Sequence, residues 1–167
     1  MIFNDRIAAA QKLAQALSEY RGKNPLVLAI PRGSVPMAKL IAEQLQGEMD
    51  VVLVRKLGAP GNPEFAIGSV DESGWVYLTE YAAKAGADDL YVQREVAAQM
   101  ETMRRRRAQY TPARPPVDPA GRIVIVIDDG LATGSTMIAA LHALRNRKPE
   151  QLICAVPVAP PETIQKL

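Results

Sequence analysis

One stretch decides the predicted fold: Val124-Ile125-Val126-Ile127-Asp128-Asp129-Gly130-Leu131-Ala132-Thr133-Gly134-Ser135-Thr136. Four apolar residues predict a buried strand, the small residues after the two acids predict a tight loop, and a helix is expected from Ser135. Ligands of open parallel sheets bind beyond the carboxyl ends of the strands. The stretch therefore predicts both a sheet and the edge at which a site lies.

The rest of the chain repeats this alternation of strands and helices. Strands are expected at residues 26–30, 50–54, 75–78, 122–127 and 151–157. Helices are expected from Asn4 or Asp5 to Tyr20 and over residues 35–46, 88–110 and 135–147. The alternation predicts an α/β fold with a mostly parallel sheet flanked by helices. Residues 55–68, rich in glycine and proline, are expected to form an exposed, mobile loop.

Composition restricts the class of protein. A chain of 167 residues with 48% hydrophobic content suits a single domain over residues 1–167. A net charge of +2 and 5% aromatic residues argue against a nucleic-acid partner. The single cysteine, Cys154, fits a reducing compartment. With neither a signal-peptide pattern from Met1 to Arg6 nor an apolar run approaching about 20 residues, we expect a soluble cytoplasmic protein without a membrane partner.

The loop after the acids has the residues of a phosphate cradle. Gly130 and Gly134 allow a tight turn. Backbone N–H groups, the hydroxyls of Thr133, Ser135 and Thr136, and the N-terminus of the next helix would converge on an anion.

The paired carboxylates predict what lies beside that phosphate. Asp128 and Asp129 could accept hydrogen bonds from two neighbouring hydroxyls, as in a ribose diol, and would favour a nearby magnesium ion. A diol beside a phosphate is a ribose 5-phosphate. The segment is neither a nucleotide P-loop nor a dinucleotide fingerprint, because the Gly-Lys-Ser/Thr triplet and the required glycine spacing are absent.

The whole segment resembles the signature of type I phosphoribosyltransferases, which bind 5-phosphoribosyl-1-pyrophosphate (PRPP). That signature is a run of apolar residues, two acids and a loop ending in Thr-Gly-X-Thr. The resemblance implies a Rossmann-like core in which Asp128 and Asp129 hold the ribose hydroxyls and, through water, Mg²⁺. The implied PRPP-binding residues are Arg32, Gly33, Ser34, Asp128, Asp129, Gly130, Ala132, Thr133, Gly134, Ser135 and Thr136.

Two further loops fit this family. Pro31-Arg32-Gly33-Ser34 occupies the place of the pyrophosphate loop, where relatives often carry Gly-Gly, sometimes with a cis peptide. Ser34 departs from that pattern, so a cis bond is not predicted. Arg55 and Lys56 begin a segment similar to the family's closing catalytic loop, and Glu64 is the candidate proton acceptor; a solvated loop glutamate is an equal alternative. The run from Arg55 to Glu64 resembles a bacterial subgroup whose substrate is generally unassigned.

The resemblance implies transfer of the phosphoribosyl group from PRPP to a nucleobase, with release of pyrophosphate and with Mg²⁺ as cofactor. Ala132 replaces an acid found in hypoxanthine-guanine members and matches adenine members, which favours a purine and a role in purine salvage. A homodimer is expected. Base specificity should lie in a hood above the sheet; because the chain stops at Leu167, either it is truncated or its hood is reduced.

Two other functions remain open. A non-enzymatic protein on the same fold could bind PRPP or a nucleotide to regulate a partner, and the reduced hood and Ala132 favour it. The complete Arg55-Lys56 segment favours an enzyme instead. Phosphoribosyl transfer to another acceptor, or hydrolysis of PRPP, is a third alternative.

Overall fold

The computed structural model describes residues 4–167 and divides the chain into two compact units. Unit 1 combines Met1–Val52 with Pro116–Leu167, and unit 2 is Leu53–Pro115. Met1, Ile2 and Phe3, which belong to the stretch without a signal-peptide pattern, lie outside the described residues. Within residues 4–167, no helix is both long and apolar enough to cross a bilayer.

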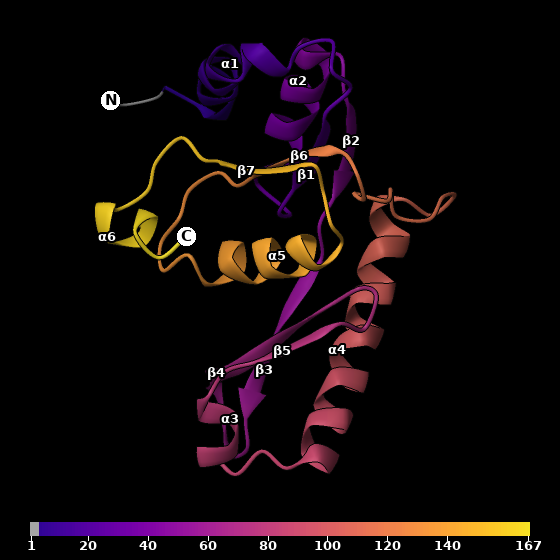
Figure 1. Cartoon of the computed structure of the whole chain (residues 1–167), viewed down its shortest axis with the longest axis vertical. Helices are drawn as coiled ribbons and strands as arrows, with labels where there is room; N and C mark the ends of the chain where they lie inside the picture. The colour runs from indigo at the N-terminus through magenta and orange to yellow at the C-terminus, as the bar shows by residue number, and fades with distance from the viewer. Residues whose placement is uncertain (1–3) are drawn as a thin grey trace. The chain divides into compact units, whose positions relative to one another are not determined.

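Unit 1 contains the predicted parallel sheet (Figure 1). Its strands lie in the order β2-β1-β6-β7, and neighbouring strands pair in parallel. The strands are β1 (Leu26–Ala29), β2 (Glu48–Val51), β6 (Ile123–Ile127) and β7 (Gln151–Ala155). The helices are α1 (Arg6–Ala16), the 3-10 turn η1 (Ser18–Tyr20), α2 (Val35–Leu45), α5 (Ser135–Asn146) and α6 (Pro161–Ile164). The predicted α/β class is confirmed, whereas the short helix α6 is absent from the prediction.

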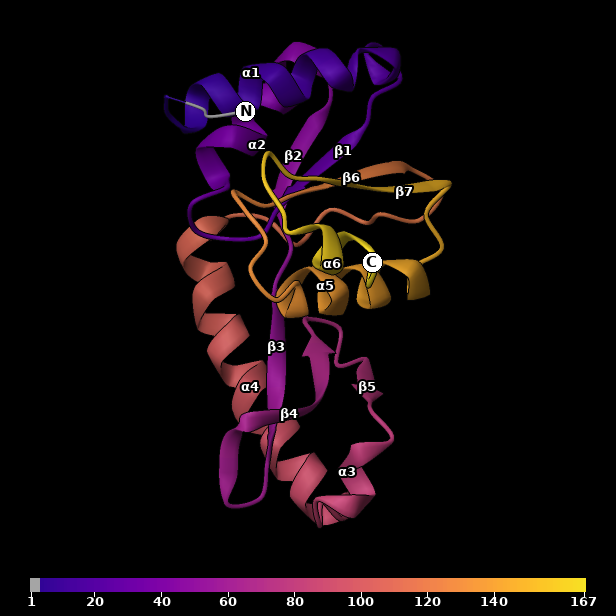
Figure 2. The same ribbon diagram turned by 90° about the vertical axis from the view of Figure 1, so that its left-hand side faces the viewer.

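Burial explains why these strands are continuous apolar runs. Helices α1 and α2 lie on one face of the sheet and α5 on the other (Figures 1 and 2). Every residue of β1 is buried, as are Val124 to Ile127 of β6. Because Ala29 is in register with Ile127, the loops that follow β1 and β6 emerge at the same edge of the sheet. This register brings two sequence-distant loops together.

Asp50, near the end of β2, is buried and bonds the chain to itself at two points. Its Oδ1 accepts a hydrogen bond from the backbone N–H of Val51 at 2.8 Å, and its Oδ2 accepts one from Val117 at 2.9 Å. The chain leaves unit 1 after Val52 and re-enters it at Pro116. Residues next to both points therefore donate hydrogen bonds to one side chain, that of Asp50.

Unit 2 corrects the prediction of a mobile loop. Residues 55–68 belong to an antiparallel hairpin, whose strands are β3 (Val54–Ala59) and β4 (Asn62–Asp71). The hairpin turns at Gly61, which has a φ of +72°. Leu57 and Ile67 are fully buried, and α4 (Asp89–Tyr110) packs on β3 and β4. The glycines and prolines of this segment conceal its strands in the sequence. In addition, the pairing register shifts around Gly58, which interrupts the alternation of apolar and polar residues that marks a strand.

Two other strand predictions need correction. The strand expected over residues 50–54 begins at Glu48 and ends at Val51, and Val54 already belongs to β3. The strand expected at residues 75–78 is β5 (Val76–Leu78), which pairs antiparallel with β4 in a separate sheet of order β3-β4-β5. The short helix α3 (Tyr81–Lys84) follows it and is not predicted.

Candidate functional site

The loop after β6 has the shape of the predicted phosphate cradle. Gly134 has a φ of +79° and immediately precedes α5, so the chain turns sharply into a helix whose first N–H groups have no partners inside the helix. The hydroxyls of Thr133 and Ser135 lie 2.9 Å apart, and Thr136 is exposed beside them. Exposed hydroxyls at a helix N-terminus of this length can bind a phosphate group.

The two adjacent carboxylates stand at the start of this loop in different surroundings. Asp128 is half-buried, and its Oδ1 accepts a hydrogen bond from the backbone N–H of Asp129 at 2.8 Å. Burial raises the pKa of Asp128 to about 6; the Asp129 backbone N–H opposes this, while the Asp129 side chain adds to it. Burial, followed by the charge of Asp128, also raises the pKa of Cys154 to about 11, so this thiol remains neutral near pH 7.

The loop after β1 touches the second carboxylate. A Cβ atom on Gly33 would lie 2.2 Å from Oδ2 of Asp129, a separation that no side chain could occupy. Arg32 is exposed next to it, and the peptide bond between Pro31 and Arg32 is cis. Ser34 is fully buried, and its hydroxyl donates to the carbonyl of Ile30. Arg32 and Gly33 thus lie beside the acids, whereas the Ser34 side chain points into the protein.

Arg6 is a site neighbour that the sequence does not reveal. It is the first residue of α1, and its Nε and Nη2 donate to Oδ2 of Asp129 at 3.1 and 2.9 Å. The two residues are separated by 123 positions. Of the two expected starts of this helix, Asn4 and Asp5, the N-cap is Asp5, whose side chain accepts a hydrogen bond from the Ala8 N–H at 2.7 Å.

The segment after β7 contacts the phosphate loop. The N–H of Leu131 donates to the carbonyl of Val158 at 3.1 Å. Thr163, 2% exposed in α6, donates its hydroxyl to the carbonyl of Ala132 at 2.9 Å. Its Cγ2 would lie 2.7 Å from a Cβ on Gly134. Two hydrogen bonds therefore join the phosphate loop to the segment after β7.

The remaining candidate residues belong to unit 2. Arg55 is half-buried in β3, and its Nε donates to Oε1 of Gln99 at 2.8 Å. Burial, with a smaller effect from the nearby cation of Arg106, lowers the pKa of Arg55. Lys56 pairs with the exposed Glu64 at 3.3 Å between Nζ and Oε2. Lys56 and Glu64 are therefore neighbours on the hairpin, and their predicted catalytic roles stay predictions.

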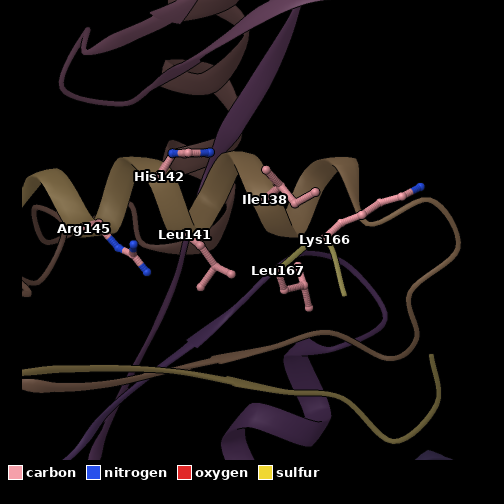
Figure 3. Close-up of a pocket in the computed structure, with 6 residues that line it drawn as sticks. All are labelled: Ile138, Leu141, His142, Arg145, Lys166 and Leu167. Carbon is pink, nitrogen blue, oxygen red and sulfur yellow. The ribbon is translucent and has the colours of Figure 1, made fainter. Parts of the chain in front are cut away.

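His142 lies outside the phosphate loop. It sits on α5, about two turns beyond Ser135. It is one of the residues that line a small pocket of unit 1 (Figure 3). The lining residues are Ile138, Leu141, His142, Arg145, Lys166 and Leu167.

The donor groups present fit magnesium bound together with a substrate. Among residues 4–167, no cluster of three or more His, Cys, Asp or Glu side chains could enclose a metal ion. Mg²⁺, however, is usually bound by one or two carboxylates together with waters and substrate phosphates. Asp128 and Asp129 provide such a pair beside the phosphate cradle.

Comparison with known proteins identifies the family. A family model described as "Phosphoribosyl transferase domain" matches residues 2–166. The chain belongs to this family. The α/β fold described above is thus that of a phosphoribosyl transferase domain.

Relatives support this assignment at different levels. The "Putative phosphoribosyl transferase Rv0571c" of Mycobacterium tuberculosis is 36% identical over 166 residues, which cover 99% of this chain and 38% of that protein. The chain thus spans well under half the length of the curated relatives that it matches. The crystal structure of TT1426 from Thermus thermophilus is similar with a TM-score of 0.88 and 46% identity, covering 99% of this chain and 79% of that one.

A more distant structure shares only the fold. The purine phosphoribosyltransferase from Pyrococcus horikoshii matches with a TM-score of 0.57 at 15% identity, over 95% of this chain and 75% of that one.

Proposed function

We propose that this chain forms the PRPP site of a magnesium-dependent phosphoribosyltransferase that acts on a nucleobase, with a purine favoured. One observation carries the proposal: two adjacent carboxylates, Asp128 and Asp129, lie between a phosphate cradle and a second loop, whose Gly33 is in close contact with Asp129. The carboxylates suit the ribose diol, the cradle suits the 5-phosphate, and the exposed Arg32 suits the pyrophosphate.

The proposed reaction exchanges one bond for another at C1 of PRPP. The bond from C1 to the pyrophosphate oxygen breaks, and a bond from C1 to a ring nitrogen of the base forms. Catalysis would consist mainly of orienting the ribose and stabilising the departing negative charge. Arg32, Arg55 and Lys56 are the proposed cations for pyrophosphate, and Glu64 is the proposed acceptor of the proton that the base loses.

Magnesium, held by Asp128 and Asp129 through water, would neutralise charge on the phosphates when bound. A purine acceptor is supported by Ala132, which takes the place of the acid in hypoxanthine-guanine members, and by the shared fold of the purine enzyme from Pyrococcus horikoshii. Cytoplasmic purine salvage by a homodimer, with neither a membrane nor a nucleic-acid partner, belongs to the same proposal.

The experiment is to measure pyrophosphate release from PRPP and Mg²⁺ with a panel of purines, with pyrimidines and without base. Calorimetric titration with PRPP is run in parallel. Release that depends on one base supports the transferase and identifies its acceptor. PRPP binding without any release favours the regulatory alternative, whereas release without a base indicates hydrolysis.

The control is the double variant Asp128→Asn with Asp129→Asn. Both substitutions preserve side-chain shape, so the fold should survive while PRPP binding is lost. An affinity equal to that of the wild type would show that the carboxylates do not hold the ribose.

A further inference from the structure

Arg6 touches the proposed diol site from the far end of the chain. Two of its guanidinium nitrogens, Nε and Nη2, donate to the same oxygen of Asp129, Oδ2, at 3.1 and 2.9 Å. The side chain approaches from the first turn of α1, whose start is fixed by the Asp5 cap. A guanidinium is planar and rigid. Two of its donors on one oxygen therefore restrain the orientation of the carboxylate and also balance its negative charge.

Gly33 limits where this carboxylate can lie. A Cβ atom there would be 2.2 Å from Oδ2 of Asp129 and 3.1 Å from Nη2 of Arg6. Arg6, Gly33 and Asp129 come from three separate segments and meet at one point. Oδ2 is thus enclosed between the guanidinium and the glycine backbone.

This enclosure places the two carboxylate oxygens of Asp129 in different surroundings. Both hydrogen bonds from Arg6 go to Oδ2, and neither goes to Oδ1. The Arg6 side chain is 64% exposed and that of Asp129 33% exposed. Ion pairs this accessible stabilise a fold only slightly, so the main effect of the contact falls on the orientation of Asp129.

We propose that Arg6 is a positioning residue of the PRPP site, which holds Asp129 so that Oδ1 accepts a hydroxyl of the ribose diol. The inference rests on the proposed function. It assigns Arg6 to the sugar and not to the pyrophosphate, and this distinction can be measured.

The test compares the affinity of wild-type protein and Arg6→Ala for two ligands by calorimetry with Mg²⁺ present. PRPP carries the diol, whereas inorganic pyrophosphate has no ribose. Loss of charge-assisted orientation should weaken PRPP binding about tenfold and leave pyrophosphate binding unchanged. Lys12→Ala removes one positive charge from the same helix and should change neither affinity.

A double-mutant cycle separates positioning from general destabilisation. Once Asp129→Asn has removed the charge that Arg6 orients, adding Arg6→Ala should cause little further loss of PRPP affinity. Arg6→Lys, which keeps the charge but not the fork of donors, should lie between wild type and Arg6→Ala.

The outcomes are distinct. Three outcomes would overturn the inference and leave the proposed function standing. They are equal weakening of PRPP and pyrophosphate binding, additive losses in the double-mutant cycle, and unchanged PRPP affinity in Arg6→Ala. Tighter PRPP binding in Arg6→Ala would also overturn it, because Arg6 would then compete with the ribose for Asp129. A wild-type protein that does not bind PRPP would overturn the proposed function, and the inference with it.

Discussion

Asp128 and Asp129 are neighbours in sequence with different energetic roles. Asp129 is paired with a guanidinium, whereas Asp128 is half-buried and receives the backbone N–H of Asp129. The pKa of Asp128 is about 6, against an ordinary value of 3.8. The folded protein therefore holds the carboxyl proton of Asp128 more tightly than the unfolded chain does. Ionising Asp128 near neutral pH therefore destabilises the ligand-free fold.

This predicts that Asp128→Asn is more stable than the wild type at pH 8, by about 1 to 2 kcal/mol after allowance for partial exposure. The stabilisation from the protonated acid is fully present below about pH 4 and is lost as the pH rises through about 6. The advantage of the asparagine should therefore vanish below about pH 4. Thermal unfolding of both proteins across this range measures it, and an advantage that persists below about pH 4 would contradict the argument.

We expect Gly33 to tolerate no side chain, for a steric reason. Gly33→Ala should displace the Asp129 carboxylate, because the added Cβ would meet its Oδ2 at 2.2 Å. Overpacking of this kind costs about 1 to 3 kcal/mol. If the whole cost falls on the bound state, PRPP affinity falls by about fivefold to about 150-fold. Lys39→Ala, at an exposed position of α2, is the comparison. Equal affinity in both variants would show that the carboxylate relocates without consequence.

At the scale of elements, α6 acts on the phosphate loop through one buried side chain. Thr163→Val removes the hydroxyl that binds the Ala132 carbonyl but keeps the methyl group near Gly134. We expect a loss of about 1 kcal/mol in the free energy of unfolding, together with weaker binding of inorganic phosphate.

Thr163→Ser reverses the experiment, since it keeps the hydroxyl and removes the methyl group. It should bind phosphate more like the wild type. Denaturant unfolding and phosphate titration check both variants. A valine variant that matches wild type in phosphate affinity would mean that α6 does not shape the loop.

An ion pair with little exposure joins helix α4 to the turn between β4 and β5 in unit 2. Arg107 and Glu72 are 11% and 21% exposed, and Arg107 Nη2 lies 2.5 Å from Glu72 Oε1. Because removal of one partner leaves the other charge partly desolvated, Glu72→Gln should destabilise the protein by about 2 kcal/mol.

Glu101 provides the comparison on the same helix. Its pairs with Arg104 and Arg105 are much more exposed, so Glu101→Gln should destabilise the protein much less than Glu72→Gln does. Chemical denaturation of both variants measures the difference. Similar losses would indicate that burial does not control the strength of these pairs.

For the whole molecule, sequence periodicity predicts the parallel sheet well and the hairpin poorly. Leu26 to Ala29 and Val124 to Ile127 are buried from both faces, so their continuous apolar runs have one sensible interpretation. Around Gly58 the pairing register shifts, and the run of glycines and prolines conceals strands that α4 stabilises from a distance in sequence.

The site divides in the same way. The acids and the phosphate loop are contiguous and could be predicted. The contact of Arg6 with Asp129 could not, because it depends on how the start of α1 lies against the loop after β6, and no sequence pattern joins positions 6 and 129. Ser34 shows the opposite case: it lies in the expected loop, yet its hydroxyl is used inside the protein.

The two hydrogen bonds that Asp50 accepts, from Val51 and from Val117, have a consequence for how this architecture can diversify. Leu53–Pro115 departs from and returns to unit 1 at adjacent points, so its length and sequence can change without pulling the sheet apart. In evolutionary terms we expect this segment to vary more freely than the sheet of unit 1. Arg6, Gly33 and Asp129 all lie outside it, so a lineage could change this segment, including Arg55 and Lys56, while keeping the residues proposed to hold the ribose.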